Sequence, residues 1–295
     1  MITLSGLMAF LPTPFTDDDQ LDTAAVERQV EFLVQGGVDS VVVAGGVGEF
    51  YALTSDEHRE LVVTAVGAAS GRLPVIAGVG HSTTMAAELA GRAARSGASA
   101  LMVNPLYFVR PELRGLIEHY RALGAAADLG LIVFSTRGAR YGPNELEALA
   151  QVPQVAAVKD EVGDLDAFTR CRERLGNRYT WINGMAEPMA MEYAAAGAQA
   201  MTSGLANLDP LLSSEIWAAA LAGDQARYDE LMRRAEPILS LRRSRPGLHT
   251  TVLKEGTAWL GRTTPFVRLP LVPLDESDRL ALVDMMSGLA APAVG

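Results

Sequence analysis

The chain has little of several residue types, and each shortage excludes something. Its 295 residues include one cysteine, Cys171, which excludes a disulfide framework and is typical of a reducing cytoplasm. The four histidines share no metal-ligand spacing such as HxH or HExxH. No apolar stretch approaches the roughly 18 residues needed to cross a bilayer, and no basic segment typical of a signal peptide opens the chain. We therefore expect a cytoplasmic protein with no metal, cofactor or membrane partner.

Positive charge is also scarce. Lys and Arg together number 25 against 35 Asp and Glu, which gives a net charge of −10. This balance argues against nucleic acid as a partner, because nucleic acid is a polyanion. Only two of the basic residues are lysines, Lys159 and Lys254. Lys254 falls in a predicted helix over residues 250–260 and is interpreted as an ordinary surface residue.

What the chain does have is a regular alternation of two kinds of apolar segment. Hydrophobic residues make up 49% of the sequence, enough to bury a large core. Eight short runs without period-2 alternation are typical of buried parallel strands, and segments with helical spacing lie between them. This pattern predicts a (β/α)8 TIM barrel over residues 1–207 and a C-terminal helical region over 208–295. The predicted strands are 7–11, 40–44, 74–78, 100–103, 130–134, 155–158, 179–182 and 199–202.

Lys159 is the most informative single residue. It closes the apolar run Val155–Val158, at the end of the sixth predicted strand. Burying an ammonium group costs several kcal/mol unless it is paired or loses its proton. Active sites of such barrels lie at the carboxyl ends of the strands, so Lys159 is a candidate neutral amine that forms a Schiff base with a carbonyl substrate. The alternative is a lysine that leaves the sheet and extends to water.

A glycine-rich loop, Gly45–Glu49, follows the second predicted strand. Glycines let backbone N–H groups approach an anion closely, so this loop is a candidate cradle for a carboxylate. It is not a phosphate-binding P-loop, since no Gly-Lys-Ser/Thr follows. Asp160 and Glu161, directly after Lys159, are interpreted as caps of the next helix.

Motifs along nearly the whole chain, in order and spacing, resemble the dihydrodipicolinate synthase/N-acetylneuraminate lyase superfamily. These motifs are Gly45–Glu49, Leu53–Arg59, Pro74–Gly80, Asn104–Tyr107, Val158–Asp160 and Thr202–Asn207. Within the superfamily the chain is most similar to the 5-dehydro-4-deoxyglucarate dehydratase branch. The Gly-Gly opening of the loop and the stretches Lys159–Asp164 and Val267–Leu271 carry that similarity.

The resemblance implies a class I lyase. Lys159 would form an imine with the C2 carbonyl of a 2-keto acid, and the amides of Gly46 and Val47 would hold the carboxylate. In the dehydratase branch, electron flow into the imine would expel water and carbon dioxide. Family members are commonly tetramers in which a tyrosine, matched by Tyr107, reaches a neighbouring subunit's site. A homo-oligomer, tetramer or dimer, is therefore expected. The alternative for Tyr107 is a structural role, since a tyrosine that follows a proline often packs against its own subunit.

Two positions depart from the family pattern. Phe134 stands where the family usually has a tyrosine, and Val47 stands where it has a threonine, so both hydroxyls of the proton relay are missing. A general acid–base group contributes about 10²–10⁴ in rate, so this loss implies altered or absent chemistry. Ser135, Tyr141 or an ordered water are candidates to replace the relay.

The remaining candidates are substrate-binding residues. Arg137 and Arg140, in the loop after the fifth strand, are candidates to bind an acid group, although exposed loop arginines are more often only solvated. Ser203 completes the set, since it lies in the last family motif. Two hypotheses stay open at this point: a Schiff-base lyase, with dehydratase or pyruvate-dependent aldolase outcome, and a catalytically silent relative that binds keto acids as a sensor.

Overall fold

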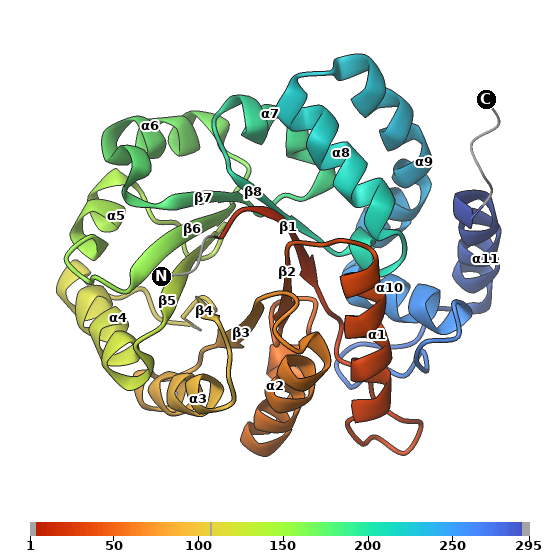
Figure 1. Cartoon of the computed structure of the whole chain (residues 1–295), viewed down its shortest axis with the longest axis horizontal. Helices are drawn as coiled ribbons and strands as arrows, with labels where there is room; N and C mark the ends of the chain where they lie inside the picture. Colours follow the sequence, from red (N-terminus) through yellow and green to blue (C-terminus); the bar gives the residue numbers. More distant parts are fainter. Residues whose placement is uncertain (1–3, 107, 291–295) are drawn as a thin grey trace.

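The computed structural model describes residues 4–106 and 108–290 and is a closed barrel of eight parallel strands ringed by helices (Figure 1). The strands pair in chain order, and β1 closes the barrel against β8. The predicted TIM barrel is therefore confirmed. The strands are β1 (Gly6–Phe10), β2 (Ser40–Val43), β3 (Val75–Val79), β4 (Ala100–Val103), β5 (Gly130–Thr136), β6 (Val155–Glu161), β7 (Thr180–Asn183) and β8 (Ala200–Ser203).

Strands β5 and β6 run further than the apolar runs indicated. Both continue as a paired ladder through Thr136 and Glu161, where the side chains become polar. Lys159 therefore lies two residues before the end of β6. Since side chains alternate across a strand, Lys159 and Glu161 share one face.

Several helices begin at side chains that satisfy free backbone N–H groups. Thr54 and Glu57 form a capping box at the start of α2, and Asp164 caps α6. Asp160 and Glu161 are therefore not the cap of that helix, contrary to the sequence interpretation. The helices of the barrel are α1 (Thr23–Gln35), α2 (Ser55–Ala69), α3 (Thr83–Arg95), α4 (Leu113–Ala127), α5 (Pro143–Leu149), α6 (Leu165–Leu175), α7 (Ala190–Ala195) and α8 (Pro210–Ala222).

The buried side chains form two groups. A large one fills the space between strands and helices, and a smaller one fills the inside of the barrel. Phe10 and Phe134 belong to the inner group. The register pairs Phe134 with Lys159, so the lysine side chain is carried into this inner layer rather than toward the helices.

Three further helices, α9 (Gln225–Ser244), α10 (Leu248–Trp259) and α11 (Glu276–Ala290), pack together on one side of the ring (Figure 1). The C-terminal region is helical, as the sequence predicts. Helix α8 packs on β1 and α7 as the eighth helix of the ring. The division into two units at residue 207 stays a prediction.

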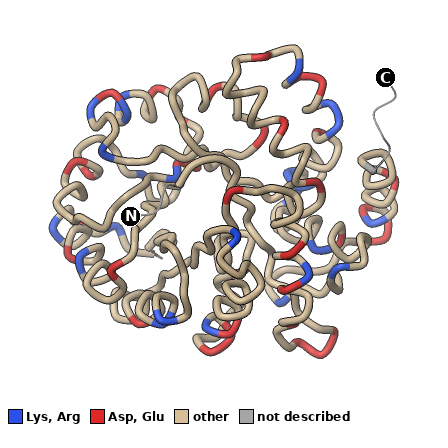
Figure 2. The backbone as a smooth tube through the Cα atoms, in the orientation of Figure 1, with Lys and Arg blue, Asp and Glu red and all other residues tan. Residues whose placement is uncertain are grey.

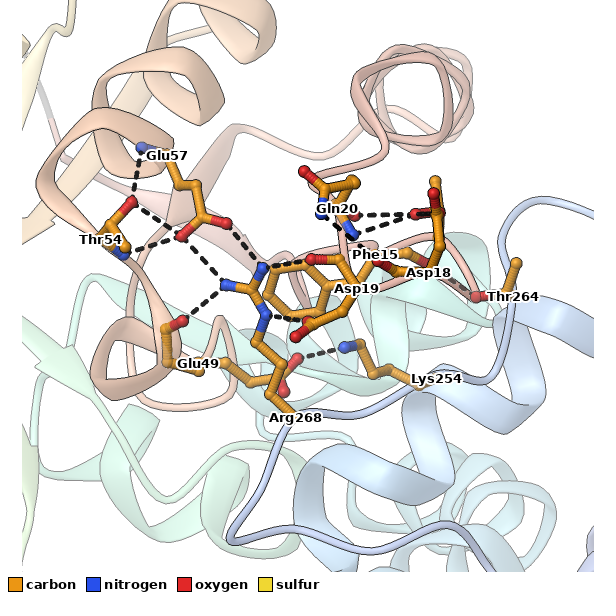
Figure 3. A network of polar contacts seen from close by, with 12 residues as sticks. Phe15, Asp18, Asp19, Gln20, Glu49, Thr54, Glu57, Lys254, Thr264 and Arg268 are labelled. Atoms are coloured by element: carbon orange, nitrogen blue, oxygen red, sulfur yellow. Dashed lines mark hydrogen bonds and ion pairs between the residues drawn. The ribbon is translucent and has the colours of Figure 1, made fainter.

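The irregular segment between α10 and α11 returns to the barrel through Arg268. Its guanidinium bonds Glu57 Oε1 at 2.6 Å and Asp19 Oδ1 at 2.5 Å (Figure 3). The same group donates to the carbonyl oxygen of Ala52. Arg268 therefore ties the C-terminal part of the chain to the loops after β1 and β2.

The prediction of a surface position for Lys254 is wrong. Its side chain is 1% exposed, and Nζ lies 2.5 Å from Oε1 of Glu49, which is fully buried (Figure 3). Nζ also lies 4.4 Å from the centre of the Phe15 ring. Burial lowers the pKa of Lys254 and raises the pKa of Glu49. The charge of each residue opposes the pKa shift that burial causes in its partner. The ion pair fixes the end of the glycine-rich loop to α10.

Charged residues of both signs are spread around the outer helices (Figure 2). None of the helices in the described parts of the chain has the length and apolar content that crossing a bilayer requires. The cytoplasmic location stays a prediction.

Candidate active site

A cavity of about 770 Å³ opens at the carboxyl ends of the strands. Its walls come from the ends of β5, β6 and β8, from the glycine-rich loop and from the C-terminal helices. The polar or ionisable residues among its lining are Thr136, Arg137, Lys159, Glu161, Thr202, Ser203, Arg242, Arg243, His249 and Thr250. Its position is where TIM barrels hold their reaction centres.

Lys159 lies at the floor of this cavity with its amine against aromatic rings. Nζ is 3.4 Å from the centroid of the Phe134 ring and 5.1 Å from that of Phe10. Its one ion-pair partner among the described residues is Glu161, whose Oε2 lies 2.5 Å away. Burial lowers the pKa of Lys159, while Glu161 and, to a smaller extent, Asp160 oppose that shift. The amine is therefore closer to its reactive neutral form than an exposed lysine is.

The glycine-rich loop forms another part of the cavity wall. Thr13 Oγ1 donates a hydrogen bond to the carbonyl oxygen of Gly48 at 2.7 Å. Position 48 must be a glycine, because a Cβ there would lie 2.9 Å from the carbonyl oxygen of Leu11. Gly46 faces open space. Across residues 4–106 and 108–290, no protein acceptor takes a hydrogen bond from the amides of Gly46 or Val47. Two backbone donors are thus available at the cavity for an anion.

The cavity carries an excess of positive charge. Arg137, Arg242 and Arg243 line it beside Lys159, whereas Glu161 is the only acid among the described lining residues. Arg242 is buried, and burial lowers its pKa to about 10, so it stays charged at neutral pH. Its Nε donates to the carbonyl of His249. Such a site favours an anionic ligand.

The structure brings together six of the residues predicted from sequence and leaves three aside. The six that line the cavity are Gly46, Val47, Phe134, Arg137, Lys159 and Ser203. Tyr107 lies outside the described residues. The other three are Ser135, Arg140 and Tyr141.

Ser135, Arg140 and Tyr141 do not reach the cavity for identifiable reasons. Ser135 faces away from the barrel interior, because it alternates with Phe134, and its Oγ accepts from the Tyr141 amide at 3.2 Å. Arg140 forms an exposed ion pair with Asp164 at 2.7 Å. Arg140 and Tyr141 line a smaller pocket beside α4.

Sequence reasoning missed Glu161 and the residues that the C-terminal helices contribute. Glu161 could have been found, since a residue two positions after Lys159 on a strand shares its face. Arg242, His249 and Thr250 line the cavity only because α9 and α10 pack beside the mouth of the barrel. No local pattern in the sequence predicts that these C-terminal residues line the cavity.

Among the described residues, no group of three or more His, Cys, Asp or Glu is arranged to hold a metal ion. Cys171 is buried outside the cavity, and burial raises the pKa of its thiol to about 11.

Fold and site together define a (β/α)8-barrel protein with a buried lysine in a cationic cavity. The chain belongs to the dihydrodipicolinate synthetase family, whose family model matches residues 3–289. A probable 5-dehydro-4-deoxyglucarate dehydratase of Saccharopolyspora erythraea is 35% identical over 298 residues, 99% of this chain and 95% of the relative. One of a Bradyrhizobium species is 33% identical over 294 residues, covering 98% and 94%.

Solved structures of the same family have the same fold. Dihydrodipicolinate synthase from Oceanobacillus iheyensis has a TM-score of 0.89 and 28% identity, covering 96% of this chain and 95% of its own. The enzyme from Acinetobacter baumannii, solved with pyruvate, has a TM-score of 0.88 and 28% identity, covering 97% and 99%.

Proposed function

We propose that the protein is a lyase that forms a Schiff base through Lys159 with a 2-keto acid or sugar-acid derivative. The observation that carries this proposal is the buried Lys159 amine in a cationic cavity that also contains the free amides of Gly46 and Val47. The ketone carbon would bond to Nζ while the two amides hold the adjacent carboxylate. The resulting iminium withdraws electrons from a neighbouring bond, which lets that bond break.

The names of the relatives favour a reaction like that of 5-dehydro-4-deoxyglucarate dehydratase, with loss of water and carbon dioxide. Phe134 and Val47 carry no hydroxyl, so the proton transfers must differ from a tyrosine–threonine relay. A pyruvate-dependent aldolase is the related alternative, because it needs the same imine. We also propose that the protein is a homo-oligomer.

A second candidate function is a keto-acid sensor without turnover. The observation that favours it is the apolar contact of the Lys159 amine with Phe134, where a proton-transfer group would otherwise be expected. Both functions predict ligand binding, but only the first predicts a covalent adduct.

The test is borohydride reduction in the presence of pyruvate or, separately, a keto diacid of five or six carbons, followed by intact and peptide mass spectrometry. The chain supplies its own control, since Lys254 is the only other lysine. An adduct on Lys159 that disappears in Lys159→Ala supports the lyase. Absence of any adduct, or labelling of Lys254 instead, would contradict it. Turnover of the same acids then separates the dehydratase, aldolase and sensor alternatives.

A further inference from the structure

Phe134 and Val47 leave the cavity without the usual proton-transfer hydroxyls, and another residue near Lys159 is a candidate to replace them. Imine formation requires one proton to leave the Lys159 ammonium and another to reach the departing oxygen. The groups around Nζ are two phenyl rings, which exchange no protons, and the carboxylate of Glu161 at 2.5 Å. That separation is within hydrogen-bonding distance.

Hydroxyl groups in the cavity are mostly engaged elsewhere. Thr202 donates to the Asn183 carbonyl at 3.2 Å, and Ser203 donates to Glu187. Thr136 Oγ1 accepts from the Ala139 amide at 3.2 Å. Thr250 lies on α10, and within the described parts of the chain the Lys159 amine bonds to Glu161 and not to Thr250.

The two members of the ion pair differ in their access to water. The Lys159 side chain is 4% exposed, whereas that of Glu161 is 44% exposed. Here one carboxylate joins the buried amine to the open part of the cavity, which is the arrangement that proton exchange with substrate and solvent requires.

The position of Glu161 follows from the strand itself. Residues 159 and 161 are i and i+2 on β6, and their register partners on β5 are Phe134 and Thr136. The carboxylate therefore lies one layer nearer the mouth than the amine, on the side from which a substrate enters.

We propose that Glu161 is the catalytic residue that transfers protons during imine formation at Lys159. This inference rests on the proposed Schiff-base function. The ammonium proton passes to the carboxylate, and the freed lone pair of Nζ forms a bond to the ketone carbon. The carbonyl π electrons move to oxygen, which takes up a proton released by the nitrogen. Protonated Glu161 then donates to that hydroxyl, the C–O bond breaks, water leaves, and the nitrogen lone pair completes the iminium.

The balance of this step is closed. Glu161 begins and ends as a carboxylate, and the sum of the step is ammonium plus ketone to iminium plus water. No oxidant, reductant or metal is needed. Glu161 would thus allow Lys159 to react although the cavity lacks both hydroxyls of the family's proton relay.

Other charged groups face this pair and also influence the pH dependence of any rate measured at Lys159. Asp160 follows Lys159 on the strand, and His249 interacts electrostatically with Glu161 from α10. The remaining charged residues that line the cavity are Arg137, Arg242 and Arg243.

The test measures the rate of imine formation rather than its final extent. Wild type and Glu161→Gln are mixed with pyruvate, sampled by rapid quench into borohydride, and the reduced adduct is quantified by mass. Glu161→Gln should slow adduct appearance by about 10²–10⁴-fold. Glu161→Asp should recover part of the rate. Glu147→Gln, which changes an exposed ion pair with Arg174, is the matched control and should leave the rate unchanged.

The pH profile separates proton transfer from a structural role. The wild-type rate should be nearly level around neutral pH, because Glu161 removes the ammonium proton. In Glu161→Gln the rate should rise with pH, since solvent hydroxide must do so. An unchanged rate and profile in Glu161→Gln would overturn this inference while leaving the lyase intact. Failure of wild type to form any adduct would instead overturn the proposed function.

Discussion

The amine of Lys159 lies 3.4 Å from the centroid of the Phe134 ring, and the two residues are register partners across β5 and β6. The ring face stabilises the ammonium, whereas burial favours the neutral amine. The reactivity of Lys159 therefore depends on a residue that can neither donate nor accept a proton.

Replacing Phe134 with leucine should lower the pKa of Lys159. The substitution removes a cation–π contact worth about 0.5–2 kcal/mol, which corresponds to roughly 0.4–1.5 pH units. The pH dependence of Lys159 acylation by a small reagent measures this, with its midpoint moving to lower pH. Ile132→Leu, in the same inner group, is the control. An unmoved midpoint in Phe134→Leu would show that the ring has no electrostatic role.

Restoring the family hydroxyls should rescue the loss of Glu161. Val47→Thr with Phe134→Tyr is expected to change wild-type imine formation by less than about threefold but to raise the Glu161→Gln rate at least about tenfold, since a hydroxyl relay then replaces the carboxylate. Rapid-quench trapping of all four backgrounds gives the comparison. A large gain in the wild-type background would instead indicate a dehydratase whose activity has decayed.

Breaking the buried pair between Lys254 and Glu49 should destabilise the fold. Lys254→Met leaves an uncompensated buried carboxylate, which typically costs about 3–5 kcal/mol of unfolding free energy. Urea unfolding measures the change. Arg227→Met, which removes exposed pairs with Glu215 and Glu230, should cost about 0–1 kcal/mol per pair. Equal small losses in the two variants would mean that the buried pair contributes little.

Acid should weaken the attachment made by Arg268. Its bonds lower the pKa of Glu57 from 4.5 to about 2, so the folded state holds this proton less tightly than the unfolded state. The stabilisation is therefore complete above about pH 4.5 and is lost as the pH falls toward 2. Melting temperatures of wild type and Glu57→Gln should differ at pH 6 and converge near pH 2. Glu60→Gln, an exposed change on the same helix, should follow wild type throughout.

The barrel could be predicted because its information is local. Each strand is a short buried run, and several helices carry their own side-chain cap, so the sequence predicts all eight strands to within a few residues of their bounds. Lys159 was found for the same reason. Lys254 was not, since its helix looks ordinary and its partner Glu49 lies about 200 residues earlier, joined to it only by tertiary packing.

The same limit applies to the cavity. The loop amides and Phe134 follow from strand order, but Arg242 and His249 become part of the cavity wall only when α9 and α10 pack beside the barrel. Ser135 and Tyr141 were expected at the site because they are close in sequence, and strand alternation turns Ser135 away.

The enclosure of both lysines also makes the native protein unusual as a target for amine-directed chemistry. Lys159 is reached only through the cavity, and Lys254 is packed between Glu49 and the Phe15 ring. Acylation of the two lysines in the folded chain therefore measures two different structural changes. Modification of Lys159 reports an unoccupied mouth, and modification of Lys254 reports that α10 has come away from the barrel.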